Sequence, residues 1–233
     1  MEYILSILRC KRNSDTPYWQ DFKYISQADN DTVISALKYI NAQENIYDIH
    51  GNEAEKIEFQ CSCLQKKCGS CALVVNGRPT LGCNAILKDY KGVIKVEPLR
   101  KFKTVCDLVV DRSILFENLK TLRLWLEEDA NIKEKRRWLT YDASECIQCG
   151  LCLEVCPNFY CGGNFFGMNS IILTTRLLTE INENERKIIA KLYDKHAYSG
   201  CAKSLACKKV CPKGIQTDKL LVNANLLAIW KKK

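Results

Sequence analysis

Fifteen cysteines stand in this chain of 233 residues, and most of them lie only a few residues apart. Thiolates separated by two to four residues can meet at one metal centre, whereas an odd cysteine count fits a disulfide framework poorly. The cysteines therefore predict bound metal and a reducing compartment. Their spacing divides them into three groups, each with its own chemistry.

The first cysteine group lies in the sequence CSCLQKKCGSC and the later LGC. Its spacing, C-x4-C-x2-C-x11-C, is the plant-type [2Fe-2S] pattern. The predicted ligands are Cys63, Cys68, Cys71 and Cys83. Gly69 and Ser70 are small, so backbone N–H groups can approach the sulfurs. Zinc is the weaker alternative because structural zinc usually binds two C-x2-C pairs, and Cys61 is the minor alternative to Cys63 because only Cys63 gives the four-residue spacing.

The second group, CIQCGLCLEVCP, matches the bacterial ferredoxin pattern C-x2-C-x2-C-x3-C-P. The third, CAKSLACKKVCP, has Ser204 in place of one cysteine. In two-cluster ferredoxins the last cysteine of each run binds the cluster of the other run. This crossover predicts one [4Fe-4S] cluster, with the ligands Cys146, Cys149, Cys152 and Cys211. The ligands left for the third cluster are Cys156, Cys201 and Cys207. Because serine oxygen is a poorer ligand than thiolate for iron in a sulfide cluster, we expect that cluster to be [3Fe-4S].

The residues around the first group predict a small α+β domain. Three segments have the composition and alternation of strands: 3–10, 71–77 and 92–99. Asn76-Gly77 has the composition of a hairpin turn. Residues 31–43 show a helical pattern with Asp31 as its cap. These elements predict an N-terminal plant-type ferredoxin-like (β-grasp) domain over residues 1–105.

The remaining cysteine groups lie among predicted helices. Apolar residues recur at helical spacing in three segments: 114–128, 184–194 and 218–233. Ser113 is the expected cap of the first and Thr217 of the last, whose Leu220, Ala224 and Leu227 share one face. Residues 106–233 therefore form a mainly α-helical, bacterial-ferredoxin-like domain, which makes the overall fold class α+β.

Several function classes are disfavoured by the composition. The net charge of +8 counts thiols as neutral, and bound clusters would reduce it. No basic stripe is interleaved with aromatic residues, so we expect no nucleic-acid partner. No apolar run reaches the ~18 residues of a membrane span. A G-x-G-x-x-G sequence is absent, and His50 and His196 stand alone. We therefore expect no catalytic residue in this chain.

The cysteine pattern as a whole resembles the iron–sulfur subunit of the succinate dehydrogenase and fumarate reductase family. CGSC, FKTVCDLVVD and CPKGI look like signatures of that family. The resemblance implies an electron-transfer subunit with three clusters, in the order 2Fe, 4Fe and 3Fe. It also implies an FAD-containing flavoprotein partner that interconverts succinate and fumarate, and a membrane-anchor subunit that holds quinone. The implied location is the cytoplasm, peripheral on the inner face of the membrane through these partners.

Two positions depart from the resemblance. Cys161 and Ala202 stand where quinone-linked succinate dehydrogenases tend to have tryptophan and histidine. The alternative is therefore the same relay in a soluble fumarate reductase-like complex that uses a thiol, a ferredoxin or another carrier. A non-redox zinc-binding interaction module is a remote alternative. Cys10 and Cys106 do not belong to any of the three cluster spacings. We interpret them as small apolar side chains in the core.

Overall fold

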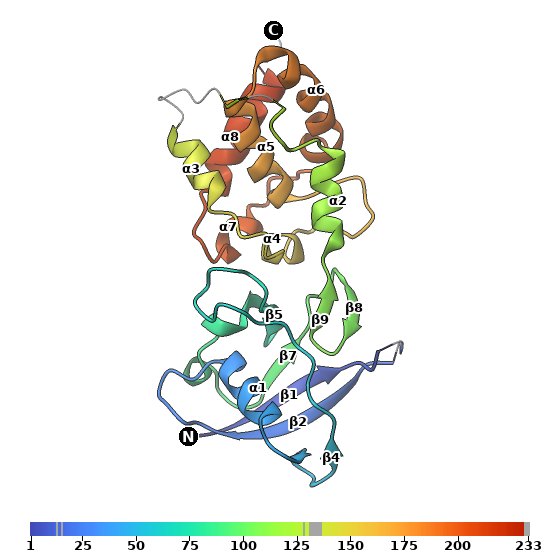
Figure 1. Ribbon diagram of the computed structural model, residues 1–233, viewed down its shortest axis with the longest axis vertical. Coiled ribbons are helices and arrows are strands. Elements are labelled where there is room, and N and C mark those ends of the chain that lie inside the picture. The colour runs from blue at the N-terminus through green and yellow to red at the C-terminus, as the bar shows by residue number, and fades with distance from the viewer. Residues whose placement is uncertain (13, 15, 128, 131–136, 231–233) are drawn as a thin grey trace. The chain divides into compact units, whose positions relative to one another are not determined.

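The computed structural model describes residues 1–12, 14, 16–127, 129–130 and 137–230 (Figure 1). The chain divides into two compact units, Met1–Asp111 and Arg112–Lys233. The predicted boundary after residue 105 falls inside a strand of the first unit, Lys103–Cys106. Each unit has its own hydrophobic core and is described by itself.

The first unit is built on a five-stranded sheet with the order β2-β1-β7-β5-β6. Its strands are β1 (Glu2–Arg9), β2 (Tyr18–Ile25), β5 (Ala72–Val75), β6 (Arg78–Leu81) and β7 (Ile94–Glu97). β1 is antiparallel to β2 and parallel to β7, and β7 is the middle strand of the sheet. The three strands predicted from sequence are thus confirmed, and β2 and β6 add to them.

Helix α1 (Val33–Asn41) covers one side of this sheet and buries Val33, Ile34 and Leu37 (Figure 1). Two short 3-10 helices, η1 (Gly82–Asn84) and η2 (Leu87–Asp89), follow β6. A Cβ on Gly82 would lie 2.8 Å from the Ile34 side chain, so glycine permits η1 to approach the helix closely. The chain that carries Cys83 is therefore fixed against the core of the unit.

The predicted cap of α1 was wrong by one residue. Thr32 is the N-cap, and its hydroxyl accepts the N–H of Ser35 in a capping box. Asp31 turns away from the helix, where its carboxylate accepts from the Tyr24 hydroxyl at 2.6 Å and the Gln27 N–H at 2.7 Å. Asp31 therefore stabilises the turn that follows β2 instead.

Short strand pairs complete the first unit. They are β3 (Ile46–Tyr47) with β4 (Glu53–Ala54), and β8 (Lys103–Cys106) with β9 (Val109–Asp111). The predicted hairpin turn is confirmed: Asn76 and Gly77 both have positive φ, 46° and 76°, between Val75 and its partner Arg78.

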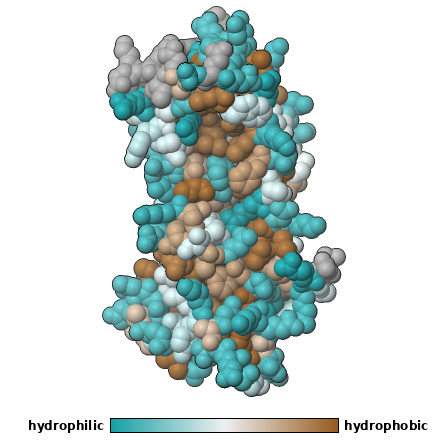
Figure 2. All heavy atoms as spheres, in the orientation of Figure 1, coloured by the Kyte–Doolittle hydropathy of each residue, from teal (hydrophilic) through white to brown (hydrophobic). Residues whose placement is uncertain are grey.

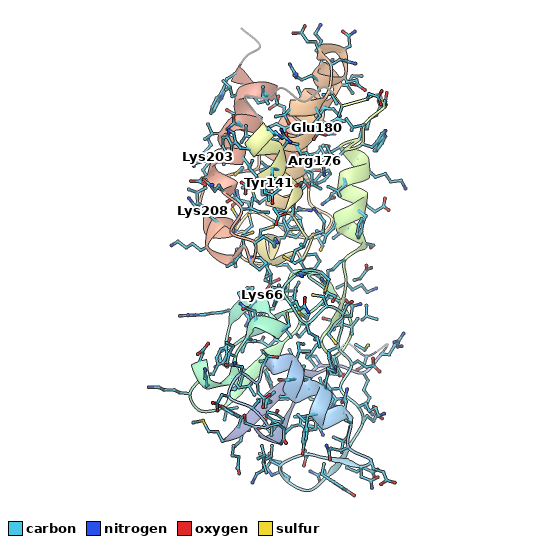
Figure 3. All side chains as sticks on the ribbon, turned by 60° about the vertical axis from the view of Figure 1, so that its left-hand side comes forward. Lys66, Tyr141, Arg176, Glu180, Lys203 and Lys208 are labelled. Atoms are coloured by element: carbon cyan, nitrogen blue, oxygen red, sulfur yellow. The ribbon has the colours of Figure 1, made fainter. Side chains whose placement is uncertain are left out.

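The second unit is helical. Its helices are α2 (Ser113–Thr121), α3 (Arg137–Ser144), α4 (Leu151–Glu154), α5 (Met168–Glu180), α6 (Glu183–Tyr193), α7 (Ala206–Val210) and α8 (Thr217–Ala228), with a π-helical turn, η4, at Asp194–Tyr198. α5 is the central element: it packs against α8, α3, α6, α4 and α2 (Figure 1). Even Glu180 on α5 is buried, and it pairs with Arg176 one turn earlier at 3.4 Å (Figure 3).

Two helix predictions in this unit need correction. Ser113 is the first residue of α2, not its cap, and α2 ends at Thr121 instead of continuing to 128, which lies outside the described residues. The N–H of Leu124 bonds to the Leu119 carbonyl and that of Arg123 to Lys120, while Arg123 has a φ of 55°. This bond pair is a Schellman ending, and it stops the helix.

Helix α8 likewise begins one residue away from its predicted cap. Gln216 occupies the N-cap position, and Thr217 is the first helical residue and is fully buried. Leu220, Ala224 and Leu227 are buried on one face, as predicted, and residues 231–233 lie outside the described part of the chain. The helix predicted at 184–194 is confirmed as α6 with an Asn182 cap.

The surface of the second unit is mixed in character. Figure 2 shows hydrophobic residues gathered among hydrophilic ones over its helices. Large apolar side chains exposed in this unit include Phe116, Trp125, Trp138, Tyr141, Val222 and Trp230. No helix in the described ranges is long and apolar enough to cross a bilayer.

Candidate iron–sulfur centres

The loop before β5 directs backbone N–H groups toward a sulfur atom. The N–H groups of Gln65 and Lys67 both donate to Cys63 Sγ at 3.3 Å. This geometry requires positive φ at Leu64 (56°) and at Lys66 (59°), which lies in the same loop (Figure 3). A thiolate at Cys63 would be stabilised by these donors, as cluster ligands in proteins generally are.

The other thiols of the first group lie within electrostatic reach of one another. The hydroxyl of Ser70, 3.1 Å from Cys68 Sγ, and the backbone near Cys63 lower the pKa of Cys68 to about 6. Burial raises the pKa of Cys71 to about 12, with further contributions from Cys83 and Cys68. The structure thus brings the four predicted ligands of the first group close enough to influence one another, and neither shift has Cys61 among its causes.

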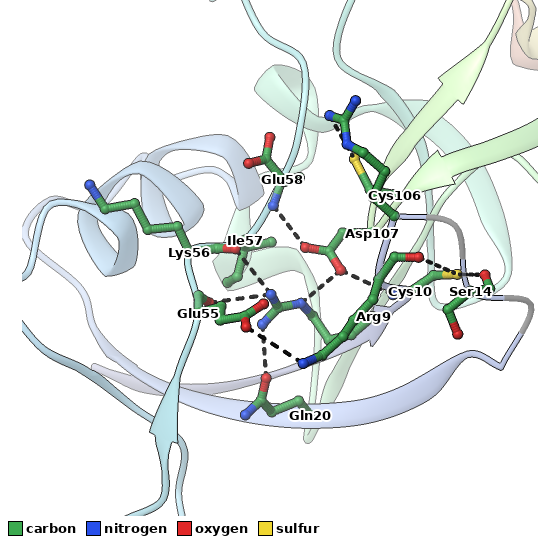
Figure 4. A network of polar contacts seen from close by, with 12 residues as sticks. Arg9, Cys10, Ser14, Gln20, Glu55, Lys56, Ile57, Glu58, Cys106 and Asp107 are labelled. Atoms are coloured by element: carbon green, nitrogen blue, oxygen red, sulfur yellow. Dashed lines mark hydrogen bonds and ion pairs between the residues drawn. The ribbon is translucent and has the colours of Figure 1, made fainter.

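A buried ion pair supports the chain that enters this loop (Figure 4). Arg9 Nε lies 3.0 Å from Asp107 Oδ1, and both side chains are buried. Asp107 also accepts the N–H of Cys10 at 3.0 Å and of Glu58 at 2.9 Å. Arg9 donates to the carbonyl oxygens of Glu55 and Lys56. The network ties β1, the β8–β9 turn and residues 55–58 together directly before the cysteine loop.

Cys10 and Cys106 border this network. Cys106 is buried, in agreement with the prediction of a core side chain, and the Arg12 guanidinium lies 3.9 Å from its sulfur. Cys10 is half-buried, and its sulfur contacts the Ser14 carbonyl at 3.0 Å. Its environment is therefore more polar than predicted.

In the second unit, one pocket gathers four cysteines from two distant runs. These are Cys146, Cys149, Cys152 and Cys211. Gln148 and Asn169 line the same pocket, and Gln148 Nε2 donates to Cys146 Sγ at 3.2 Å. Burial raises the pKa of Cys146 to about 11, and Cys149 and Cys211 add to this shift.

A second pocket is lined by the remaining three cysteines of these runs: Cys156, Cys201 and Cys207. Ser204, Ala202 and Lys203 also line it, and Lys203 is marked in Figure 3. Burial raises the pKa of Cys201, with Cys156 as a further cause. Burial likewise raises the pKa of Cys207.

The donor chemistry of these sites fits iron–sulfur clusters. All fifteen thiols are free of disulfides, and each pocket of the second unit is lined by three or four soft sulfur ligands. In the described residues, no three His, Cys, Asp or Glu side chains are placed to hold a single metal ion. Sequence reasoning overlooked Gln148 as a hydrogen-bond donor to sulfur, although its place between two ligands was a signal.

Comparison with known proteins agrees with this geometry. Residues 4–117 match the 2Fe-2S iron-sulfur cluster binding domain family, and residues 142–215 match the 4Fe-4S dicluster domain family. The chain is 34% identical over 221 residues to the succinate dehydrogenase iron-sulfur subunit of Bacillus subtilis, covering 90% of this chain and 85% of that one. This chain belongs to the succinate dehydrogenase and fumarate reductase iron–sulfur subunit family.

Other relatives span the same part of the chain. The fumarate reductase iron-sulfur subunit of Escherichia coli O157:H7 is 29% identical, with 91% of this chain and 86% of that one aligned. An uncharacterized iron-sulfur protein of Methanocaldococcus jannaschii is 32% identical, but this chain covers only 39% of its length. A chain of the Mycobacterium smegmatis Sdh1 complex in the apo form superimposes with a TM-score of 0.81 at 22% identity, covering 99% of this chain and 97% of that one.

These findings confirm the predicted α+β fold, with a 2Fe-2S ferredoxin-like domain ahead of a 4Fe-4S domain. They also confirm the family and the role of the chain as an electron-transfer subunit of an oxidoreductase complex.

Proposed function

We propose that this subunit relays single electrons between an FAD-containing flavoprotein, which interconverts succinate and fumarate, and a quinone pool. The observation that carries the proposal is the grouping of cysteines in the second unit. Residues from two runs some fifty positions apart line two separate pockets, and each pocket combines ligands of both runs. This grouping is what a crossover of ligands between two clusters requires.

The proposed ligand sets follow the three groups. Four thiols hold a [2Fe-2S] cluster: Cys63, Cys68, Cys71 and Cys83. A [4Fe-4S] cluster takes Cys146, Cys149, Cys152 and Cys211. Cys156, Cys201 and Cys207 would hold a [3Fe-4S] cluster, and Ser204 lines the same pocket without offering a thiolate. When bound, each cluster accepts and releases one electron at a time.

The chain's own residues bind these clusters and limit their access to solvent. Backbone N–H groups at Gln65 and Lys67 stabilise the negative sulfur of Cys63. In the second unit, Leu221 and Phe165 give the pocket of Cys156 an apolar wall. Succinate oxidation releases two electrons at the flavin, so two single transfers through this subunit complete each turnover.

Partner subunits complete the proposed enzyme. The flavoprotein supplies the dicarboxylate site, and a membrane anchor supplies the quinone site and holds the complex at the inner face of the cytoplasmic membrane. The names of the relatives, succinate dehydrogenase and fumarate reductase, support such an assembly.

Affinity purification of the native complex tests this proposal. We expect a flavoprotein with bound FAD to copurify and the complex to oxidise succinate or reduce fumarate with an artificial electron carrier. The isolated, cluster-loaded chain should do neither, because its sequence contains no G-x-G-x-x-G fingerprint of a dinucleotide site. Turnover by the isolated chain, or a native complex without a flavoprotein, would contradict the proposed relay.

A second candidate keeps the relay but replaces quinone by a soluble carrier such as a thiol or a ferredoxin. It is favoured by exposed Cys161 and by Ala202 in the wall of the Cys156 pocket, where quinone-linked relatives tend to have tryptophan and histidine. Comparing a quinol analogue with a dithiol as electron donor to the native complex separates the two candidates.

A further inference from the structure

Gln148 stands between two proposed ligands in a conformation that other contacts must maintain. Its φ is 52°, in the left-handed region that non-glycine residues adopt only where surrounding contacts hold them there. In this conformation its Nε2 lies 3.2 Å from Cys146 Sγ. The side chain also lines the pocket of the four cysteines, so the contact is made at the place where a cluster would bind.

Asn169 holds the Gln148 amide in one orientation. Asn169 lies in the first turn of α5 and is 1% exposed, and its Nδ2 donates to Gln148 Oε1 at 3.3 Å. Because the Gln148 oxygen is occupied as an acceptor, the Gln148 NH₂ group faces the sulfur. The reverse orientation would place a carbonyl oxygen against a thiolate, which is repulsive.

The Asn169 side chain has a second, independent peculiarity. Its Oδ1 is buried and makes no hydrogen bond within the described residues, a costly arrangement for an amide. Asn169 lines the cysteine pocket together with Gln148. An apolar side chain would satisfy packing at this site without that cost. The buried amide therefore indicates a function that packing alone does not explain.

We propose that Gln148, held by Asn169, raises the reduction potential of the [4Fe-4S] cluster. The inference rests on the proposed ligand set for that cluster. Reduction adds one electron, and the added negative charge spreads over the cluster sulfurs. An N–H donor stabilises the more negative state more strongly, so it favours reduction. Gln148 donates a hydrogen bond in both states and exchanges no proton, which makes it a positioning residue and not a catalytic one.

The neighbouring cluster has a longer side-chain contact to sulfur. The Thr217 hydroxyl lies 3.9 Å from Cys207 Sγ, whereas Gln148 Nε2 lies 3.2 Å from Cys146 Sγ. The short side-chain contact at Cys146 is therefore expected to act on one cluster of the second unit and not on both.

Redox titration of the native complex, followed by electron paramagnetic resonance, tests the inference. Gln148→Met removes the side-chain N–H groups, leaves the backbone N–H in place and keeps a similar volume. We expect the equilibrium constant for reduction of the [4Fe-4S] cluster to fall about tenfold, which is 59 mV for one electron. Asn169→Leu should shift the midpoint less in the same direction. Ile171→Val, which is buried on the same helix α5 but lines neither cysteine pocket, is the matched control and should leave the midpoint unchanged.

The double variant separates a positioning role from a purely structural one. If Asn169 acts through Gln148, then the double variant has the same midpoint as Gln148→Met alone. Additive shifts would contradict this part of the inference. An unchanged midpoint in Gln148→Met, with full iron content, would overturn the inference while leaving the ligand set intact. A parent complex without a [4Fe-4S] signal would overturn both.

Gln148→Glu decides the case if Gln148→Met does not retain the cluster. Glutamate has the same size but presents an oxygen to the sulfur, so the midpoint should fall. A midpoint equal to that of the parent, or above it, would overturn the inference.

Discussion

The two cysteine regions place their thiols in contrasting environments. In the first unit a surface loop holds Cys63 by backbone N–H groups, and Cys68 is exposed. In the second unit burial raises the pKa values of five ligand thiols, and it raises that of Cys152 well above its usual range. The five are Cys146, Cys149, Cys152, Cys201 and Cys207. The loop is fixed from outside by the sheet and by the Arg9–Asp107 pair, whereas the short helices α4 and α7 supply ligands to the two pockets of the second unit. The first site therefore depends less on its cluster than the second.

Removing iron should give the largest difference between the two units. α4 and α7 have only four and five residues, which is too short for stability without tertiary contacts, and they carry Cys152 and Cys207. We expect hydrogen exchange in the iron-free protein to increase strongly in α4 and α7 and little in β1 and β7. Equal loss of protection in the sheet would contradict the comparison.

Substituting single ligands should affect one site without the other. Cys63→Ser should abolish or strongly perturb the [2Fe-2S] signal and leave the clusters of the second unit intact, because the ligand sets share no residue. Cys61→Ser is the matched control and should leave all spectra unchanged. The opposite result, with Cys61→Ser as the damaging change, would make Cys61 the ligand.

Breaking the buried ion pair should destabilise the first unit alone. Asp107→Leu leaves the Arg9 guanidinium buried without its carboxylate and removes acceptors for two backbone N–H groups. The expected loss is about 3–5 kcal/mol of unfolding free energy. Denaturant titration with hydrogen exchange in each unit measures it. A loss below about 1 kcal/mol would show that the pair is dispensable.

A smaller effect is expected from Gly167→Ala in the second unit. Gly167 has a φ of 81° before α5, and a Cβ there would overlap the Leu153 side chain. Strain and the displaced leucine should cost about 2 kcal/mol. Thermal unfolding would show it as a lower melting temperature of the second unit. Gly214→Ala is the control, since a Cβ there has open space at a similar φ of 68°.

Features of the fold that depend on local sequence patterns were predicted correctly, whereas features that depend on other contacts were not. Strands β1, β5 and β7 and the Asn76-Gly77 turn follow from alternation and turn composition. The prediction that Asp31 caps a helix was wrong because its carboxylate accepts a hydrogen bond from the Tyr24 hydroxyl. The helical pattern of residues 31–43 does not indicate this contact. The predicted end of α2 was wrong because Arg123 adopts a left-handed backbone conformation, which an arginine in the sequence does not predict.

The cysteine groups of the candidate site were predictable because they too form a local sequence pattern. Cysteine spacing is a local signal, so the three groups could be found from sequence alone. The contact of Asn169 with Gln148 could not, because it joins residues of two elements whose packing no motif encodes. The side-chain hydrogen bond to Cys146 could therefore be identified only from the structure.

The assignment of the third cluster is tested most directly by electron paramagnetic resonance of the air-oxidised holoprotein. With three thiolates and Ser204 around it, this cluster should be [3Fe-4S] and give a signal from a single unpaired spin near the free-electron g value. Mild reduction should remove the signal before the [4Fe-4S] cluster accepts an electron, and Ser204→Cys should convert the cluster toward [4Fe-4S] with a lower potential. Two [4Fe-4S] clusters and no [3Fe-4S] signal in the unmodified protein would contradict the assignment.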